Sequence, residues 1–165
     1  MMSTIIFSAI GKDINNVVEI GAGFGNWARL NNDIINFNKW TMIDLEFVTK
    51  LQKWYINQTV TNSSNIDFVS VDTPTFNPWA SNLKEVDLVI GSHSLSEVSI
   101  EVFNLYYDTV LPKTRYFFYA AHKSQPSKKL LHTKLKMIAE KFNIITEVES
   151  SEGKVINILY EKKNG

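Results

Sequence analysis

The stretch that decides the fold is Val17–Trp27, which reads VVEIGAGFGNW. It begins as a β-branched apolar run, turns acidic at Glu19, and then carries glycine at the alternate positions 21, 23 and 25. Glycine permits positive φ and lets the backbone approach a ligand without an intervening Cβ. A helix start near Asn26 adds exposed N–H groups and the positive end of a helix dipole. The pattern predicts a parallel strand that passes into a helix around a nucleoside-type cofactor.

The composition predicts one domain that spans residues 1–165. Lys plus Arg and Asp plus Glu both number 17, so the formal net charge is zero, which argues against a nucleic-acid partner. The chain has no cysteine, so disulfides, thiolate metal sites and cysteine nucleophiles are excluded. No apolar run approaches the roughly 20 residues that span a bilayer, and no signal peptide is recognised. We therefore expect no membrane association and a cytoplasmic location.

Short β-branched runs alternate with helical patterns along the chain. This alternation predicts an α/β fold with a mainly parallel sheet. The expected strands are Val17–Ile20, Trp40–Ile43, Ile66–Val71, Val86–Ile90, Arg115–Ala121, Ile144–Glu149 and Val155–Tyr160. Only residues 150–154 separate the last two strands, whereas a parallel crossover needs about a dozen residues. We therefore predict that these two strands form an antiparallel hairpin.

Apolar residues recur at helical spacing between the strands. The spacing predicts three stripes that face the core. They are Phe47, Leu51, Trp54 and Tyr55 after the second strand, Val98, Val102, Leu105 and Tyr106 after the fourth, and Leu131, Leu135, Ile138 and Phe142 after the fifth. Lysines 128, 129, 134 and 136 are expected on a solvated helix face.

Three features beside the glycines narrow the choice of cofactor. Asn26 stands where a dinucleotide fingerprint would carry its third glycine. Asp44 directly follows the second strand, where its carboxylate can accept both hydroxyls of a ribose. Asp72 follows the third strand at the same edge, where an adenine amino group can donate to it. The alternative is that both aspartates only form turns at strand ends.

Taken together, Glu19, the three glycines, Asp44, Asp72 and the terminal hairpin resemble the class I S-adenosylmethionine-dependent methyltransferases. The resemblance covers the chain from about residue 15 onward. It implies a three-layer αβα Rossmann-like fold with a seven-stranded sheet of order 3-2-1-4-5-7-6, strand 7 antiparallel. It also implies S-adenosylmethionine as the cofactor.

The same resemblance implies which residues contact that cofactor. They are Glu19, Gly21, Gly23, Gly25, Asp44, Leu45, Asp72 and Ser92. In the family pattern the glycines pack against the methionine part, and the acidic residue at 19 orients the loop from beneath. The residues at 44 and 45 hold the ribose and flank the adenine, and the residue at 72 meets the adenine edge.

The segment Gly91–Glu97, which reads GSHSLSE, follows the fourth strand and is the candidate acceptor side. Ligands of open α/β sheets bind beyond the carboxyl ends of the strands, at the topological switch point. Methyl transfer to a hydroxyl needs a base, for which His93 is the first candidate and Glu97 the second. His122, after the fifth strand, is a rival base at the same edge. The alternative for both histidines is a purely structural role. The alternative for Glu97 is a capping box, in which Ser94 is the N-cap of the helix that follows.

A second, local resemblance concerns the acceptor. The segments Ile43–Leu45, Lys53–Tyr55 and Ser92–Glu97 are similar to the sugar O-methyltransferase group of the superfamily, with Leu95 where phenylalanine is usual. This resemblance implies in-line methylation of a sugar or glycan hydroxyl. The alternatives are a protein or RNA methyltransferase and a non-catalytic cofactor-binding or scaffold protein.

The residue pattern and the size of the chain predict which metals and partners the protein needs. No His and carboxylate set shows metal-ligand spacing, so no metal is expected. A bare seven-stranded core leaves little chain for a lid, apart from the first 16 residues and the loop from Ala121 to Lys128. We therefore expect a lid from a second copy or a partner subunit, or a large acceptor that covers the site itself.

Overall fold

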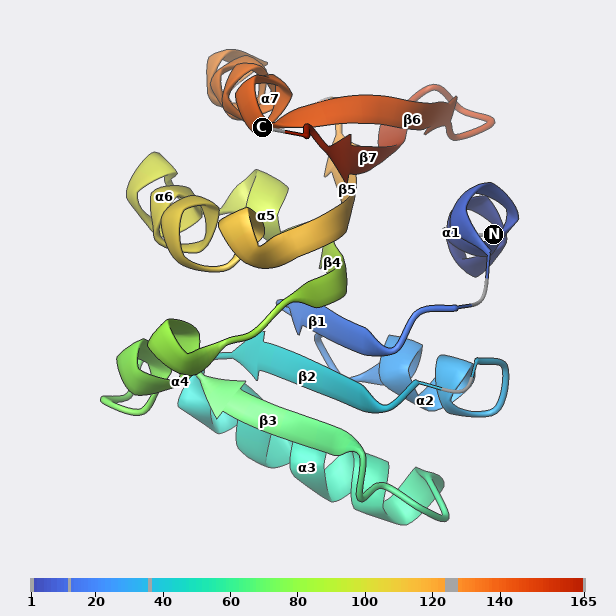
Figure 1. Cartoon of the computed structure of the whole chain (residues 1–165), viewed down its shortest axis with the longest axis vertical. Helices are drawn as coiled ribbons and strands as arrows, with labels where there is room; N and C mark the ends of the chain where they lie inside the picture. Colours follow the sequence, from blue (N-terminus) through green and yellow to red (C-terminus); the bar gives the residue numbers. More distant parts are fainter. Residues whose placement is uncertain (1, 12, 36, 124–127, 165) are drawn as a thin grey trace.

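A computed structural model describes residues 2–11, 13–35, 37–123 and 128–164, which form three layers (Figure 1). The described residues build a seven-stranded sheet of order β3-β2-β1-β4-β5-β7-β6, which runs from the bottom to the top of Figure 1. The strands are β1 (Asn16–Ile20), β2 (Lys39–Asp44), β3 (Ile66–Ser70), β4 (Val86–Ser92), β5 (Thr114–His122), β6 (Phe142–Glu149) and β7 (Val155–Lys162). Strand β7 is antiparallel to β5 and β6, so the predicted order and hairpin are both confirmed.

Helices cover both faces of the sheet. One face carries α1 (Met2–Ile10), α2 (Asn26–Asn32) and α3 (Glu46–Thr59), and the other carries α4 (Phe76–Asn82), α5 (Ser94–Glu97), α6 (Ile100–Thr109) and α7 (Lys128–Lys141). A short 3-10 turn, Leu111–Lys113, leads into β5. Within the described ranges, no helix is both long enough and apolar enough to cross a membrane.

Two apolar clusters hold the layers together. Trp40, Met42 and Ile56 belong to the cluster beneath α1, α2 and α3. Phe103 and Phe117 belong to the cluster on the opposite face. The side chains of each strand alternate between the two faces, so a strand buried on both sides reads as a continuous apolar run.

Parallel pairing brings the carboxyl ends of five strands to one edge. Ile20 at the end of β1 pairs with Ile43, and Ser92 at the end of β4 pairs with Ala120. Because of this register, the loops that follow β1, β2, β3, β4 and β5 all emerge together. All strand boundaries agree with the predicted ones to within two residues.

The prediction for the α3 stripe is wrong for three of its four residues. Phe47, Leu51 and Trp54 are exposed by 70%, 41% and 62%, whereas Tyr55 is half-buried and packs against the core. Thr49, Gln52 and Ile56 face the sheet. Helical periodicity shows which residues share a face, but it does not show which face meets the sheet.

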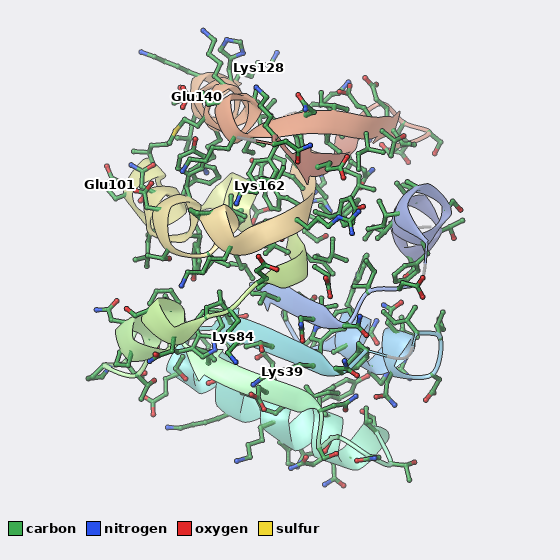
Figure 2. All side chains as sticks on the ribbon, viewed as in Figure 1. Lys39, Lys84, Glu101, Lys128, Glu140 and Lys162 are labelled. Carbon is green, nitrogen blue, oxygen red and sulfur yellow. The ribbon has the colours of Figure 1, made fainter. Side chains whose placement is uncertain are left out.

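The other two stripes follow the prediction more closely. Leu131 and Ile138 are buried under α7, whereas Val102 on α6 is exposed. The lysine-rich segment contains an exception: Lys128 at the start of α7 and Glu140 near its end are exposed (Figure 2), but Lys134 is completely buried. The expectation that Lys134 is solvated is therefore wrong, because its ammonium group binds inside the fold.

Candidate functional site

The glycine loop joins β1 to α2 and lies against the end of β4. Gly21, Gly23 and Gly25 have φ of 68°, 56° and 82°, which glycine adopts without strain. A Cβ on Gly21 would lie 2.2 Å from the Cβ of Ser94. No heavy atom lies within 4 Å of a Cβ built on Gly23, so the middle of the loop is open. The loop is thus packed tightly at its start and accessible at its centre.

Glu19 lies beneath the loop, buried in β1. The Nε1–H of Trp40 donates to its Oε2 at 3.0 Å. Burial raises the pKa of Glu19 from 4.5 to about 8, with the Trp40 hydrogen bond opposing the shift and the charge of Asp44 adding to it. The carboxyl is therefore largely protonated at neutral pH, which burial of an unpaired acid requires.

Asp44 ends β2 and is held in place from two sides. The N–H of Leu45 donates to its Oδ1 at 2.9 Å, and the Gln52 amide donates to its Oδ2 at 3.1 Å. Gln52 Nε2 also donates to the carbonyl of Gly23 at 3.0 Å. Burial raises the pKa of Asp44, while these donors lower it.

Gln52 thus ties the glycine loop to Asp44, and the sequence interpretation missed it. Its side chain is fully buried, and its Oε1 has no partner among the described residues. The sequence feature that could have revealed Gln52 is its spacing from Thr49, because the two polar residues lie three positions apart on one face of a helix.

Asp72 lies beside Asp44 at the start of α3. Its Oδ1 accepts a hydrogen bond from the N–H of Glu46 at 2.8 Å, and its side chain remains exposed. Burial raises the pKa of Tyr106 on α6, and the charges of Asp44 and Asp72 raise it further, so this hydroxyl lies within the field of both carboxylates. The helical stripe predicts Tyr106 only as a core residue, and the structure also places it in the surroundings of the site.

His93 and His122 lie together at the end of β4 and β5. Their rings are 4.7 Å apart between centroids and inclined by 34°. His93 has φ of 64°, and it is the one non-glycine residue of the described ranges with positive φ. Such backbone strain persists where the surrounding structure imposes it, often at functional sites.

The surroundings of His93 favour its neutral form. Burial and the neighbouring charge of His122 lower the pKa of His93, whereas Glu97 raises it. Its Nδ1 is buried and has no hydrogen-bond partner in the described part of the chain. Its backbone N–H donates to Ala120 at 2.9 Å, which fixes the loop to β5.

The capping-box prediction for Ser94 and Glu97 is wrong. The N-cap of α5 is His93, and Ser94 is the first helical residue. Ser94 Oγ instead donates to the carbonyl of Ile20 at the end of β1, because α5 is pressed against the glycine loop. Glu97 is exposed at the end of α5, and Ser92 ends β4 at the same edge.

Lys134 anchors the far end of α5. Its Nζ donates to the carbonyls of Leu95, Ser96 and Val98 at 2.9, 3.0 and 2.5 Å. It also lies 5.6 Å from the centroid of the Phe103 ring. Burial lowers the pKa of Lys134 to about 8. Lys134 is thus a second residue that the sequence patterns did not reveal, and it holds the turn that carries His93 and Ser94.

The structure therefore brings the predicted residues together on two sides of one edge. The glycine loop, Glu19, Asp44 and Asp72 form the first side, and His93, Glu97 and His122 form the second. Within the residues described, no group of three or more His, Cys, Asp or Glu side chains is arranged to hold a metal ion.

No family model and no curated protein sequence matches the chain. Solved structures match it in fold. The methyltransferase domain of bacterial CtHen1 aligns at a TM-score of 0.74 with 9% identity, over 97% of this chain and 96% of that one. Aeropyrum pernix fibrillarin, solved with natively bound S-adenosyl-L-methionine, aligns at 0.68 with 14% identity, over 96% and 72%.

A third similar structure is longer. Mitomycin 7-O-methyltransferase MmcR aligns at a TM-score of 0.66 with 10% identity, over 96% of this chain, which spans 52% of its length. At these identities the likeness concerns the fold. Sheet order, antiparallel β7 and helix placement all agree with it, so the chain has the Rossmann-like fold of the class I methyltransferases.

Proposed function

We propose that the protein is an S-adenosylmethionine-dependent methyltransferase that acts on a hydroxyl group of a sugar or glycan. The observation that supports this most is the pairing of a nucleoside-binding side with two histidines at one edge of the sheet. Solved structures of similar fold include a fibrillarin with the cofactor bound and a 7-O-methyltransferase, which supports both the cofactor and the reaction type.

The residues of the first side fit this cofactor. Asp44 is anchored by Leu45 and Gln52, and each carboxylate oxygen keeps a further lone pair for a ribose hydroxyl. The open centre of the loop at Gly23 leaves room for a ligand to approach the backbone. When bound, S-adenosylmethionine supplies a methyl group that its sulfonium already activates.

His93 is the proposed base. Its lowered pKa keeps the imidazole neutral near pH 7, and a neutral imidazole can take the proton of an acceptor hydroxyl. The charge of Glu97 raises the pKa of His93, so it stabilises the imidazolium that this transfer produces. His122, whose ring centroid lies 4.7 Å from that of His93, is the alternative base.

Calorimetric titration with S-adenosylhomocysteine tests the cofactor side. Binding is expected for the unmodified protein, and Asp44→Ala is expected to weaken it about 10- to 100-fold, since a hydrogen bond to a charged group contributes about 1.5–3 kcal/mol. Asp13→Ala, which removes an exposed carboxylate before β1, is the control. Absence of binding at high micromolar ligand would contradict the proposal.

Turnover with a panel of sugars and glycans tests the acceptor side. His93→Ala is expected to abolish turnover while the affinity for S-adenosylhomocysteine stays unchanged. If only His122→Ala has this effect, His122 is the base. Methylation of peptide or RNA in parallel assays, with none of the sugars, would refute the hydroxyl assignment. Retained cofactor binding with no turnover on any acceptor would indicate a non-catalytic binding protein.

A further inference from the structure

The outer face of α3, formed by Phe47, Leu51 and Trp54, is apolar although it meets no other part of the described chain's core. The inner face carries the polar Thr49 and Gln52 beside the buried Ile56. An ordinary surface helix turns its apolar stripe toward the core, whereas α3 directs these three apolar side chains outward. In Figure 1, α3 lies along β3 at the lower end of the molecule.

Hydrogen bonds from the inner face prevent α3 from rotating to bury its apolar face. Gln52 holds both Gly23 and Asp44, and the Thr49 hydroxyl is 2.8 Å from that of Ser70. These bonds fix the rotation of α3 about its axis. The apolar stripe is therefore directed outward by the same contacts that organise the glycine loop.

The stripe has the spacing and symmetry of a self-complementary seam. Phe47, Leu51 and Trp54 follow at intervals of four and three residues, as in the seam of paired helices. An aromatic residue stands at each end and leucine near the middle, so the pattern reads nearly the same in both directions. A two-fold interface requires this kind of self-complementarity.

We propose that the occupant of this face is α3 of a second copy of the chain, packed antiparallel about a two-fold axis near Lys50 and Leu51. Phe47 of each copy then faces Trp54 of the other. The axis brings the two Lys50 side chains near each other, and each of them is paired with Glu46 of its own helix at 2.9 Å, which offsets their like charge. The proposal does not depend on the proposed function.

The area of the face suits a dimer of modest size. A large aromatic side chain offers about 150–250 Å², so the exposed fractions of Phe47, Leu51 and Trp54 amount to about 350 Å² of apolar surface per copy. With the flanking stems of Lys50 and Lys53, two copies bury about 1,000–1,200 Å² in total. That is the lower range of specific interfaces, with well over half of the buried area apolar.

Sedimentation of the full chain tests the dimer. The unmodified protein is expected to sediment at twice the chain mass of 18.9 kDa at tens of micromolar. Phe47→Glu with Trp54→Glu is expected to weaken association at least 100-fold, with an unchanged circular dichroism spectrum. Val102→Glu, at an exposed apolar residue on the opposite face of the molecule, is the control. A monomer at 100 µM (roughly the limit for a weak specific interface), a dimer that resists the double substitution, or equal loss in the control would each overturn the proposal.

Disulfide trapping tests the orientation, because the chain has no cysteine of its own. Leu51→Cys, near the two-fold axis, is expected to cross-link to its copy under mild oxidation. Phe47→Cys and Trp54→Cys are expected to cross-link only when the two variants are mixed. Efficient self-linking of Phe47→Cys would indicate parallel helices, and no cross-link in any variant would refute the interface.

Discussion

Glu19→Gln is expected to stabilise the protein at alkaline pH and to leave it unchanged at acid pH. The carboxyl of Glu19 is buried in β1, and burial raises its pKa from 4.5 to about 8. The unfolded chain releases this proton from about pH 4.5 upward, whereas the folded chain keeps it until about pH 8. Between these limits the folded state binds the extra proton, so its stability falls as the pH rises.

The size of the effect follows from the shift. A change from 4.5 to about 8, at about 1.4 kcal/mol per pKa unit, amounts to about 5 kcal/mol once both states are ionised. Glutamine has nearly the same shape, keeps an oxygen that can accept from Trp40 Nε1, and carries no charge. The variant therefore removes the penalty of ionisation without opening a cavity.

Urea unfolding followed by tryptophan fluorescence measures this difference. At pH 4 the two proteins are expected to unfold at the same urea concentration. At pH 9 the midpoint of the variant is expected to lie about 2.5 M higher, for a urea dependence of about 2 kcal/mol per M. Glu85→Gln, at an exposed carboxylate, is expected to shift stability by no more than about 0.5 kcal/mol at either pH. A variant of Glu19 that is destabilised at pH 9, or whose effect does not change with pH, would refute the assigned burial of the charge.

Two further substitutions test the packing between the two sides of the site by the same unfolding assay. Gly21→Ala is expected to destabilise the fold by about 2 kcal/mol or more, because its Cβ would meet that of Ser94 and φ is positive. In Gly23→Ala the added Cβ meets no atom, so only the cost of the positive φ remains, about 1–2 kcal/mol. Equal losses in the two variants would show that the loop does not pack against α5. Lys134→Met is expected to lose about 2–4 kcal/mol, because the carbonyls that Lys134 binds lose their donor. Lys136→Met on the exposed side of α7 is expected to change little, and a neutral result for Lys134→Met would contradict the anchoring role.

Much of the candidate site could be predicted because its residues adjoin strand ends. Glycine at 21, 23 and 25 permits the turn after β1, and Asp44 and Asp72 follow directly on β2 and β3. Gln52 and Lys134 could not be predicted in this way. Both act on backbone groups far away in sequence, and a polar residue in a helix carries no local sign of the partner it will meet.

The sequence by itself determined the turn after β1 and the hairpin at residues 150–154, since these depend on local backbone freedom and on the reach of a short connection, whereas the strand order followed only from the family resemblance. Only the tertiary structure decided the orientation of α3, which turns Phe47 and Trp54 outward and Gln52 inward. The physical reason is that a helical pattern defines a face, but the hydrogen bonds available on the sheet decide whether the apolar or the polar face is buried.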